Sequence, residues 1–222
     1  MSRISVVIPA YNEASDLPQT IQGIRDLSLE CEVIVVDDGS VDDTKKIAER
    51  LADITVALPV NQGKGQALME GWKRAEGTHI VMLDADLGST SSEMAHLLPP
   101  LLTNEADLVI GMLPTHSSKK GFGLVKKRAQ QYIAKRTGAF LTAPLSGQRA
   151  FHRRWLPSLL EENVQGFGVE TQMLLHFLLR GAVVKEIPTL MAHRYTGKTI
   201  SGFIHRFQQW IDIERALRGS NT

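Results

Sequence analysis

The amino-acid sequence predicts a single α/β domain in which helices flank a mostly parallel central sheet. Four short runs rich in Val and Ile alternate with helix-like stretches, which is the pattern of parallel strands joined by crossover helices. These runs occupy residues 4–9, 31–38, 78–86 and 106–112. A chain of 222 residues with 43% apolar residues can bury a sizeable core and lies at the upper end for one domain. We therefore expect residues 1–222 to fold as one unit.

Two helix starts are indicated by spacings at or near that of a capping box. Ser40 precedes Asp43 by three residues, and Thr90 precedes Glu93 by three. Thr90 would cap its helix without help from the two aspartates before it, so helix capping does not explain those aspartates. Another helix is expected over residues 66–75, which follow a glycine-bearing loop.

The second half of the chain is expected to hold two helices, at residues 124–136 and 168–180, and a short strand at residues 182–188. Between the helices, residues 137–151 show no regular period. Residues 114–123 are polar and contain glycines, so we expect a mobile loop there that could act as a lid.

The last stretch, residues 200–217, predicts a helix with one apolar stripe. The stripe consists of Ile200, Phe203, Ile204, Phe207, Trp210 and Ile211. Packing into the core is one use for such a stripe, and contact with a lipid surface is the alternative.

Charge is divided unequally between the two halves of the chain. Residues 1–110 hold 8 Lys and Arg against 18 Asp and Glu, whereas residues 111–222 hold 17 against 6. An acidic half suits cations and hydroxyl groups, and a basic half suits a phosphorylated partner. The alternative is that both halves simply present solvated charged surfaces.

The composition indicates a cytoplasmic protein. Cys31 is the only cysteine, so there is no disulfide framework, and the first residues lack the pattern of a secretory signal. No apolar run approaches the roughly 18 to 20 residues needed to cross a bilayer. Peripheral contact at the inner face of a membrane stays open, as does a homodimer, and no nucleic-acid partner is expected.

The stretch "HIVMLDADLG" ends an apolar run in two aspartates. If the run is a strand, Asp84 and Asp86 point the same way where the strand leaves the sheet. Two neighbouring carboxylates of like charge favour binding of a cation. Hard oxygen ligands of this kind select Mg²⁺ or Mn²⁺.

The common nucleotide-binding fingerprints do not fit this chain. The residues after the first run, "PAYNEASDLP", contain no glycine, which excludes the G-x-G-x-x-G turn. A P-loop is excluded because Leu58 stands at the position of its first glycine and Gly65 at that of its Ser or Thr.

Three other loops lie at the carboxyl ends of predicted strands, where ligands bind in open α/β sheets. Candidate contacts to a nucleoside are the aromatic face of Tyr11 and the polar groups of Asn12, Glu13, Asp37 and Asp38. The segment containing Gly63, Lys64 and Gly65 precedes a helix and offers backbone amides and one cation to a diphosphate.

Together, "SVVIPAYNE", "EVIVVDDGSVDDT", "NQGKGQAL" and "HIVMLDADL" strongly resemble family 2 glycosyltransferases of the Rossmann-like GT-A fold, such as dolichol-phosphate mannose synthase. The resemblance covers residues 1–113 and implies a UDP-, GDP- or ADP-sugar donor. It implies that the first two motifs, including Pro9, hold the nucleoside. It also implies that the triplet Asp84, Ala85 and Asp86 binds Mg²⁺ or Mn²⁺ on the diphosphate.

The second half is similar to glucosyl-3-phosphoglycerate synthases in "APLSGQRAF", "GFGVETQMLL" and "HRYTGK". In those enzymes a late histidine joins the metal, which implies that His193 is the third ligand and that residues 114–222 bind the acceptor. Two departures concern the acceptor: this chain is much shorter, and Asp37 and Asp38 replace an Asp, Ser pair.

Between Leu108 and Ile211 there is no aspartate, and the only carboxylates are those of Glu161, Glu162, Glu170 and Glu186. Inverting transfer to a hydroxyl group needs a general base, whereas a phosphate acceptor is already anionic and a retaining front-face reaction lets the leaving diphosphate take the proton. Both alternatives suit the basic second half.

The candidate catalytic residues are Asp86, Lys64, Arg149 and Glu170. Arg149, with Lys126, Lys127 and Arg128, is a candidate for gripping an acceptor phosphate. Alternatively, Arg149 is a structural ion-pair partner of Glu170.

The sequence therefore predicts a metal-dependent glycosyltransferase that moves a hexose from a nucleoside-diphosphate sugar to a phosphorylated small molecule. The first alternative is a polyprenyl-phosphate glycosyltransferase at a membrane surface. Outside enzymes, the alternative is a catalytically silent subunit that binds sugar nucleotides.

Overall fold

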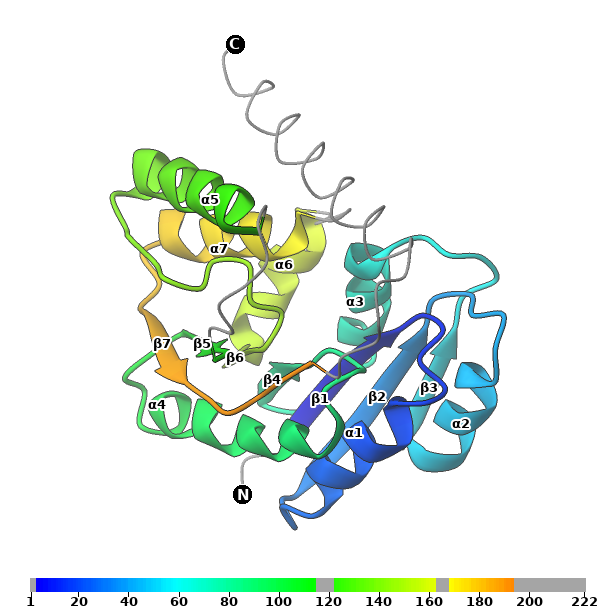
Figure 1. The fold of residues 1–222 in the computed structure, drawn as a ribbon. Coiled ribbons are helices and arrows are strands. Elements are labelled where there is room, and N and C mark those ends of the chain that lie inside the picture. The colour runs from blue at the N-terminus through cyan, green and yellow to red at the C-terminus, as the bar shows by residue number, and fades with distance from the viewer. Residues whose placement is uncertain (1–2, 115–121, 163–167, 194–222) are drawn as a thin grey trace.

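A computed structural model of the chain describes residues 3–114, 122–162 and 168–193, and its centre is a seven-stranded sheet (Figure 1). The strands lie in the order β3-β2-β1-β4-β6-β5-β7. Their bounds are β1 Ile4–Ala10, β2 Cys31–Asp37, β3 Ile54–Ala57, β4 His79–Met82, β5 Leu108–Met112, β6 Arg149–His152 and β7 Val184–Pro188.

The sheet is mostly parallel, as the sequence predicts. β1 pairs in parallel with β2 and β4, β2 with β3, and β5 with β7. Only β6 runs antiparallel, between β4 and β5. This strand lies inside the stretch 137–151 that we expected to be irregular, and that expectation is wrong for Arg149–His152. Four residues are too few to show a strand period in the sequence.

Helices cover both faces of the sheet (Figure 1). The α-helices are α1 Leu17–Arg25, α2 Thr44–Leu51, α3 Lys64–Trp72, α4 Pro99–Leu102, α5 Phe122–Thr137, α6 Leu156–Glu161 and α7 Val169–Leu179, with 3₁₀ segments at Gly88–Leu97 and Arg153–Trp155. One apolar core joins the sheet to α1, α2 and the 3₁₀ segment Gly88–Leu97. A second core joins the other face to α3, α5, α6 and α7. The predicted helices over residues 66–75, 124–136 and 168–180 are confirmed.

The two predicted capping boxes do not form. Helix α2 begins at Thr44, and the hydroxyl of Ser40 accepts a hydrogen bond from the backbone amide of Asn12 at 2.9 Å. Thr90 lies inside a 3₁₀ segment, and its hydroxyl donates to the carbonyl of Leu87 at 2.6 Å. Both hydroxyls therefore bond to backbone groups that do not belong to the predicted helix starts.

Two predicted segments lie mainly outside the described residues. The helix at residues 200–217 falls entirely there, and so does most of the loop at residues 114–123. Their uses as a membrane contact and a lid stay predictions. Within residues 3–114, 122–162 and 168–193, no helix is both long and apolar enough to cross a membrane.

Asp107, just before β5, ties three neighbouring segments together. Its carboxylate accepts hydrogen bonds from the guanidinium of Arg154, from the indole of Trp155 at 3.3 Å and from the backbone amide of Val183 at 2.9 Å. Burial would raise the pKa of this carboxyl group, but the hydrogen bonds outweigh burial and hold the pKa below its usual value of 3.8. Asp107 thereby joins β5 to the ends of β6 and β7.

We predict that Asp107→Ala lowers the free energy of unfolding by about 2 kcal/mol, because three donors lose their acceptor. A depressed carboxyl pKa contributes stability that is present above the unfolded-state pKa and is lost as the pH falls. Urea unfolding should therefore show the difference from the parent protein shrinking below about pH 4. A difference that is constant down to pH 3 would contradict the role of the charged carboxylate.

Candidate active site

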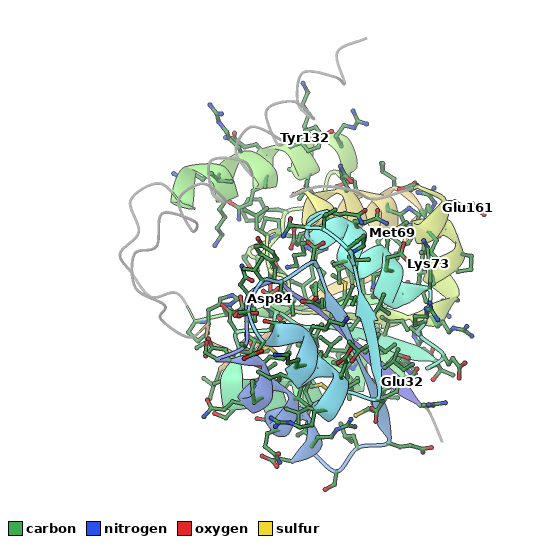
Figure 2. All side chains as sticks on the ribbon, turned by 90° about the vertical axis from the view of Figure 1, so that its right-hand side faces the viewer. Glu32, Met69, Lys73, Asp84, Tyr132 and Glu161 are labelled. Atoms are coloured by element: carbon green, nitrogen blue, oxygen red, sulfur yellow. The ribbon has the colours of Figure 1, made fainter. Side chains whose placement is uncertain are left out.

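The carboxyl ends of β1 and β4 lie side by side at the point where the strand order reverses. From β1 the chain moves outward to β2 and β3, and it then returns to β4 on the other side of β1. Ligands of open α/β sheets bind at such switch points. The loop after β1 begins with Tyr11, and the loop after β4 carries Asp84 and Asp86. Asp84 is labelled in Figure 2.

Asp84, Asp86 and His193 come together as a cluster of possible metal ligands. One ligand atom from each residue lies within 4.8 Å of the other two. His193 Nδ1 is 2.8 Å from Asp86 Oδ1, and His193 Nε2 is 3.8 Å from Asp84 Oδ2. Two carboxylates and an imidazole are donors that suit Mn²⁺ well and that also leave Mg²⁺ its preferred oxygen ligands. The residues present therefore fit a divalent cation.

Thr90 and Glu93 hold the segment that leads to His193. The backbone amide of Ala192 donates to the Thr90 hydroxyl at 3.1 Å, and the amide of Leu190 donates to Glu93 Oε2 at 2.9 Å. The two residues that the sequence suggested as a capping box therefore anchor the chain after β7. This anchoring places His193, which is far away in sequence, beside Asp86.

The turn that carries the two aspartates is fixed from helix α1. The hydroxyl of Thr20 donates to the carbonyl of Ala85 at 2.7 Å and accepts from the amide of Gly88 at 2.9 Å. Thr20 is fully buried and Ala85 is 4% exposed. Ala85 therefore contributes its backbone to the site, and Thr20 orients the loop, which the sequence did not reveal.

Lys64, the first residue of α3, bridges two carboxylates. Its Nζ lies 2.7 Å from Asp84 Oδ1 and 2.7 Å from Glu170 Oε1. Burial would lower the pKa of Lys64, but Asp84 and Glu170 outweigh burial and raise it. Burial would likewise raise the pKa of Asp84, yet Lys64, His193 and Gln148 lower it to about 2. Lys64 and Asp84 are therefore both charged at neutral pH.

Gln148 is a second partner of Asp84 that sequence reasoning missed. Its side-chain amide donates to Asp84 Oδ2 at 2.6 Å, and its carbonyl oxygen accepts from the Asp84 backbone amide at 3.1 Å. Gln148 is fully buried. Its neighbour Gly147 lets the backbone pass close to Asp84 and Lys64, because a Cβ at this position would lie 2.5 Å from Lys64 Nζ. No sequence signal marks a glutamine as the partner of a distant aspartate.

Arg149 is placed differently from the expectation that it grips an acceptor phosphate. The side chain is fully buried, and its guanidinium donates to the backbone carbonyls of Ser146, Pro144 and Glu170 at 2.7–2.9 Å. Burial lowers the pKa of Arg149 to about 10, which still leaves it charged at neutral pH. The contact with Glu170 is to its carbonyl and not to its carboxylate. Arg149 therefore holds the backbone around the site.

Asp37 and Asp38 are buried, at 2% and 3% exposure, and their contacts to a nucleoside stay a prediction. Asp38 accepts from the backbone amides of Gln62 at 2.7 Å and Gly63 at 2.8 Å. The Gly63 amide is therefore bonded to Asp38 in this structure, and its contact to a diphosphate also stays a prediction. Asp38 instead fixes the loop that leads into Lys64.

The loop after β1 is braced against the loop after β2. Asn12, at a left-handed φ of 57°, accepts from the amide of Val41 at 2.9 Å, while the amide of Glu13 donates to the Thr44 hydroxyl at 2.8 Å. Tyr11 is 38% exposed and Pro9, on β1, is partly buried. Tyr11 thus has surface available for a planar ligand.

Glu13 is electrostatically coupled to the acidic cluster. Burial, followed by the charges of Asp86, Asp16, Asp84 and Asp42, raises the pKa of Glu13 to about 8. Its carboxyl group is therefore mostly protonated at neutral pH and is able to donate a hydrogen bond.

The basic residues Lys126, Lys127 and Arg128 lie on α5, which packs over α7 (Figure 1).

Comparison with known proteins gives a family. The sequence profile described as glycosyl transferase family 2 matches residues 5–161. An undecaprenyl-phosphate 4-deoxy-4-formamido-L-arabinose transferase from Proteus mirabilis is 33% identical over 172 residues, which are 72% of this chain and 52% of that protein. Glycosyltransferase AglJ from Haloferax volcanii is 32% identical over 202 residues, or 87% of this chain and 64% of that protein. The chain thus spans about half to two thirds of these relatives.

Among solved structures, the chain is similar to glucosyl-3-phosphoglycerate synthase from Mycobacterium tuberculosis. The complex with Mn²⁺, UDP and glucosyl-3-phosphoglycerate matches with a TM-score of 0.75 and 28% identity, over 94% of this chain and 77% of that one. The complex with phosphoglyceric acid matches with a TM-score of 0.75 and 29% identity, over 96% and 79%. These similarities confirm the predicted GT-A fold.

We predict that Lys64→Met lowers the free energy of unfolding by about 3 kcal/mol, because Asp84 and Glu170 would stay charged and mostly buried without a cation. Urea unfolding in EDTA measures this change. The control is Lys45→Met, which removes a pair to Glu49 whose members are both 54% exposed and should cost under about 0.5 kcal/mol. Equal effects of the two substitutions would show that the Lys64 bridge adds no stability.

Proposed function

The chain belongs to glycosyl transferase family 2, and from this premise we propose that it moves a hexose from a nucleoside-diphosphate sugar to a phosphorylated acceptor. The observation that carries the proposal is the cluster of Asp84, Asp86 and His193 beside the carboxyl ends of β1 and β4. Solved structures of similar fold contain Mn²⁺ and UDP together with a phosphorylated acceptor or product. A donor nucleotide and a divalent cation therefore suit this cluster.

We propose that Asp86 and His193 hold Mg²⁺ or Mn²⁺ directly. Asp84 has both oxygens engaged, with Lys64 and with Gln148, so it contacts the ribose or a metal-bound water. When bound, the cation offsets the negative charge that accumulates on the departing nucleoside diphosphate. Lys64 contributes a fixed positive charge beside the same cluster.

The nucleoside is proposed to lie on the loop after β1. Tyr11 offers its exposed ring, and Asn12 and Glu13 offer polar edges beside it. Because burial and then the charges of the neighbouring acids raise the pKa of Glu13 to about 8, its carboxyl group can donate to an acceptor atom of the base. In this proposal Asp37 and Asp38 are positioning residues, because their carboxylates accept hydrogen bonds from backbone amides of the loops after β2 and before α3.

The acceptor is proposed to need no protein general base. Glu170 is paired with Lys64, Glu162 with His176 and Arg180, and Glu186 accepts from Thr142 and Ala143. The remaining glutamate between Leu108 and Ile211, Glu161, is exposed at the end of α6 and lies well apart from Asp84 in Figure 2. This distribution supports an anionic nucleophile, or a front-face reaction in which the leaving diphosphate takes the proton.

A polyprenyl phosphate is the second candidate acceptor. Undecaprenyl-phosphate transferases are among the relatives at 33% identity, whereas phosphoglyceric acid occurs in the similar solved structures. Both molecules carry a phosphate, which suits the basic second half of the chain. Peripheral contact with a membrane belongs to this second candidate alone.

We predict that Asp86→Ala abolishes the extra thermal stability that Mn²⁺ gives to a complex with a UDP-, GDP- or ADP-sugar, because a ligand raises stability only in proportion to its binding. Slow hydrolysis of the labelled donor should fall by roughly a hundredfold or more. Asp26→Ala, a substitution at the exposed residue just after α1, is the control and should behave like the parent. Unchanged hydrolysis in Asp86→Ala would refute the metal assignment. No hydrolysis by the parent protein would favour a silent binding subunit.

We also predict that transfer requires a phosphate on the acceptor. With the UDP-, GDP- or ADP-sugar that stabilises the protein most strongly in the presence of Mn²⁺ as the donor, labelled sugar should pass to phosphoglyceric acid or to undecaprenyl phosphate in detergent. Glyceric acid and undecaprenol are the matched controls and should accept at least about a hundredfold less, since they lack the charged group. Which of the two phosphorylated molecules receives the sugar, the first through its hydroxyl oxygen or the second through its phosphate oxygen, decides between the two candidates. Equal transfer to an unphosphorylated control would contradict the proposal.

A further inference from the structure

A cavity lies near the amino end of β4, at the opposite end of that strand from the candidate active site. Its volume is about 680 Å³, and it opens between the end of α3 and the start of α6. His79 and Asp84 lie at or just beyond opposite ends of β4, and His152, which lines the cavity, pairs with His79. Figure 2 shows Lys73, another lining residue, well apart from Asp84. The proposed transfer reaction does not use this cavity.

The wall of the cavity is strongly basic. Lys73, Arg153 and Arg154 line it, and none of its described lining residues is an aspartate or glutamate. Lys73 pairs with Glu70 at 2.7 Å, and Arg154 pairs with Asp107, which lies outside the lining. Within the described part of the chain, Arg153 has no ion-pair partner. The cavity therefore carries a surplus of positive charge.

Two lining residues carry buried polar atoms that have no hydrogen-bond partner among the described residues. These atoms are the indole Nε1 of Trp72, a residue with 1% exposure, and Nε2 of His152. Both atoms have almost no accessible surface, so they lie behind the cavity wall, and the charged side chains carry the argument for a ligand. Burial and the charge of Arg154 lower the pKa of His152, so its imidazole is neutral at pH 7 and has one acceptor and one donor nitrogen.

Apolar residues form the rest of the wall. Helix α6 contributes Leu156, Pro157 and Leu160, which line the cavity together with Ala75. A cavity of this kind suits a ligand with an apolar body and a charged group. Guanidinium groups bind phosphate with paired hydrogen bonds, which favours a phosphate over a less charged group.

We propose that this cavity binds a phosphate ester, with the phosphate at Arg153 and Arg154 and the apolar part against Leu156 and Leu160. The inference goes beyond the proposed transfer reaction, because it concerns a separate site and holds whichever acceptor is used. The phosphate can belong to a soluble molecule or to a lipid headgroup, since both present the same chemistry.

The test uses phenyl phosphate as the probe and phenol as its uncharged match, with isothermal titration of the whole protein in EDTA. Phenyl phosphate should bind, phenol should bind at least about tenfold more weakly, and Arg153→Gln should weaken phenyl phosphate binding about tenfold or more. Arg50→Gln, an exposed arginine on α2, makes the same charge change elsewhere and should leave binding unchanged. Arg154→Gln is not the main variant because it also breaks the pair with Asp107.

Co-sedimentation with phosphatidylglycerol vesicles identifies the source of the phosphate. Binding of phenyl phosphate without vesicle binding indicates a soluble ligand, and vesicle binding that Arg153→Gln removes indicates a headgroup. The proposal is overturned if neither probe binds, or if Arg153→Gln and Arg50→Gln have the same effect. Because the active-site residues are intact in both variants, metal-dependent donor binding reports separately on the proposed transfer reaction.

Discussion

Compensation of negative charge at the end of β4 is the constraint on which the rest of the site depends. Asp84, Asp86 and Glu170 are brought close to one another, and the single ammonium group of Lys64 balances only Asp84 and Glu170. Asp86 is left with the imidazole of His193, whose charge depends on its proton. The protein has therefore built a place where one more positive charge is favourable. A divalent cation supplies that charge together with an attachment point for an anionic leaving group.

The antiparallel strand β6 joins the two oppositely charged halves of the chain. It inserts between β4 and β5, so the residues just before it lie against the end of β4. Gln148 reaches Asp84 from this position, and Arg149 fixes the surrounding backbone through three carbonyl groups. The first half thus supplies Lys64, Asp84 and Asp86, and the second half adds Glu170 and holds the groups in one orientation. Neither half completes the cluster alone, because His193 also comes from the second half.

Much of the fold could be predicted from the sequence because the central parallel strands β1, β2, β4 and β5 are almost wholly buried and rich in Val and Ile. Asp84 and Asp86 could be singled out because they directly follow an apolar run, but β4 ends at Met82, so the turn that Thr20 fixes, and not strand alternation, sets their direction. Position alone did not reveal what each polar group bonds to. Thr90 and Glu93 have the spacing of a cap, yet they hold the chain before His193. Arg149 and Asp38 resembled ligand contacts, but tertiary packing buries both, and Thr20 and Gln148 gave no signal because their partners are distant in sequence.

Gly147 sets a limit on how this enzyme scaffold can be re-engineered. A methyl group at this position would lie 2.5 Å from the Lys64 ammonium and within 2.9 Å of both Asp84 oxygens. Libraries that diversify the loop before β6 should therefore leave this one codon fixed. The nearby position 145 is partly exposed, so it can be varied while position 147 remains glycine.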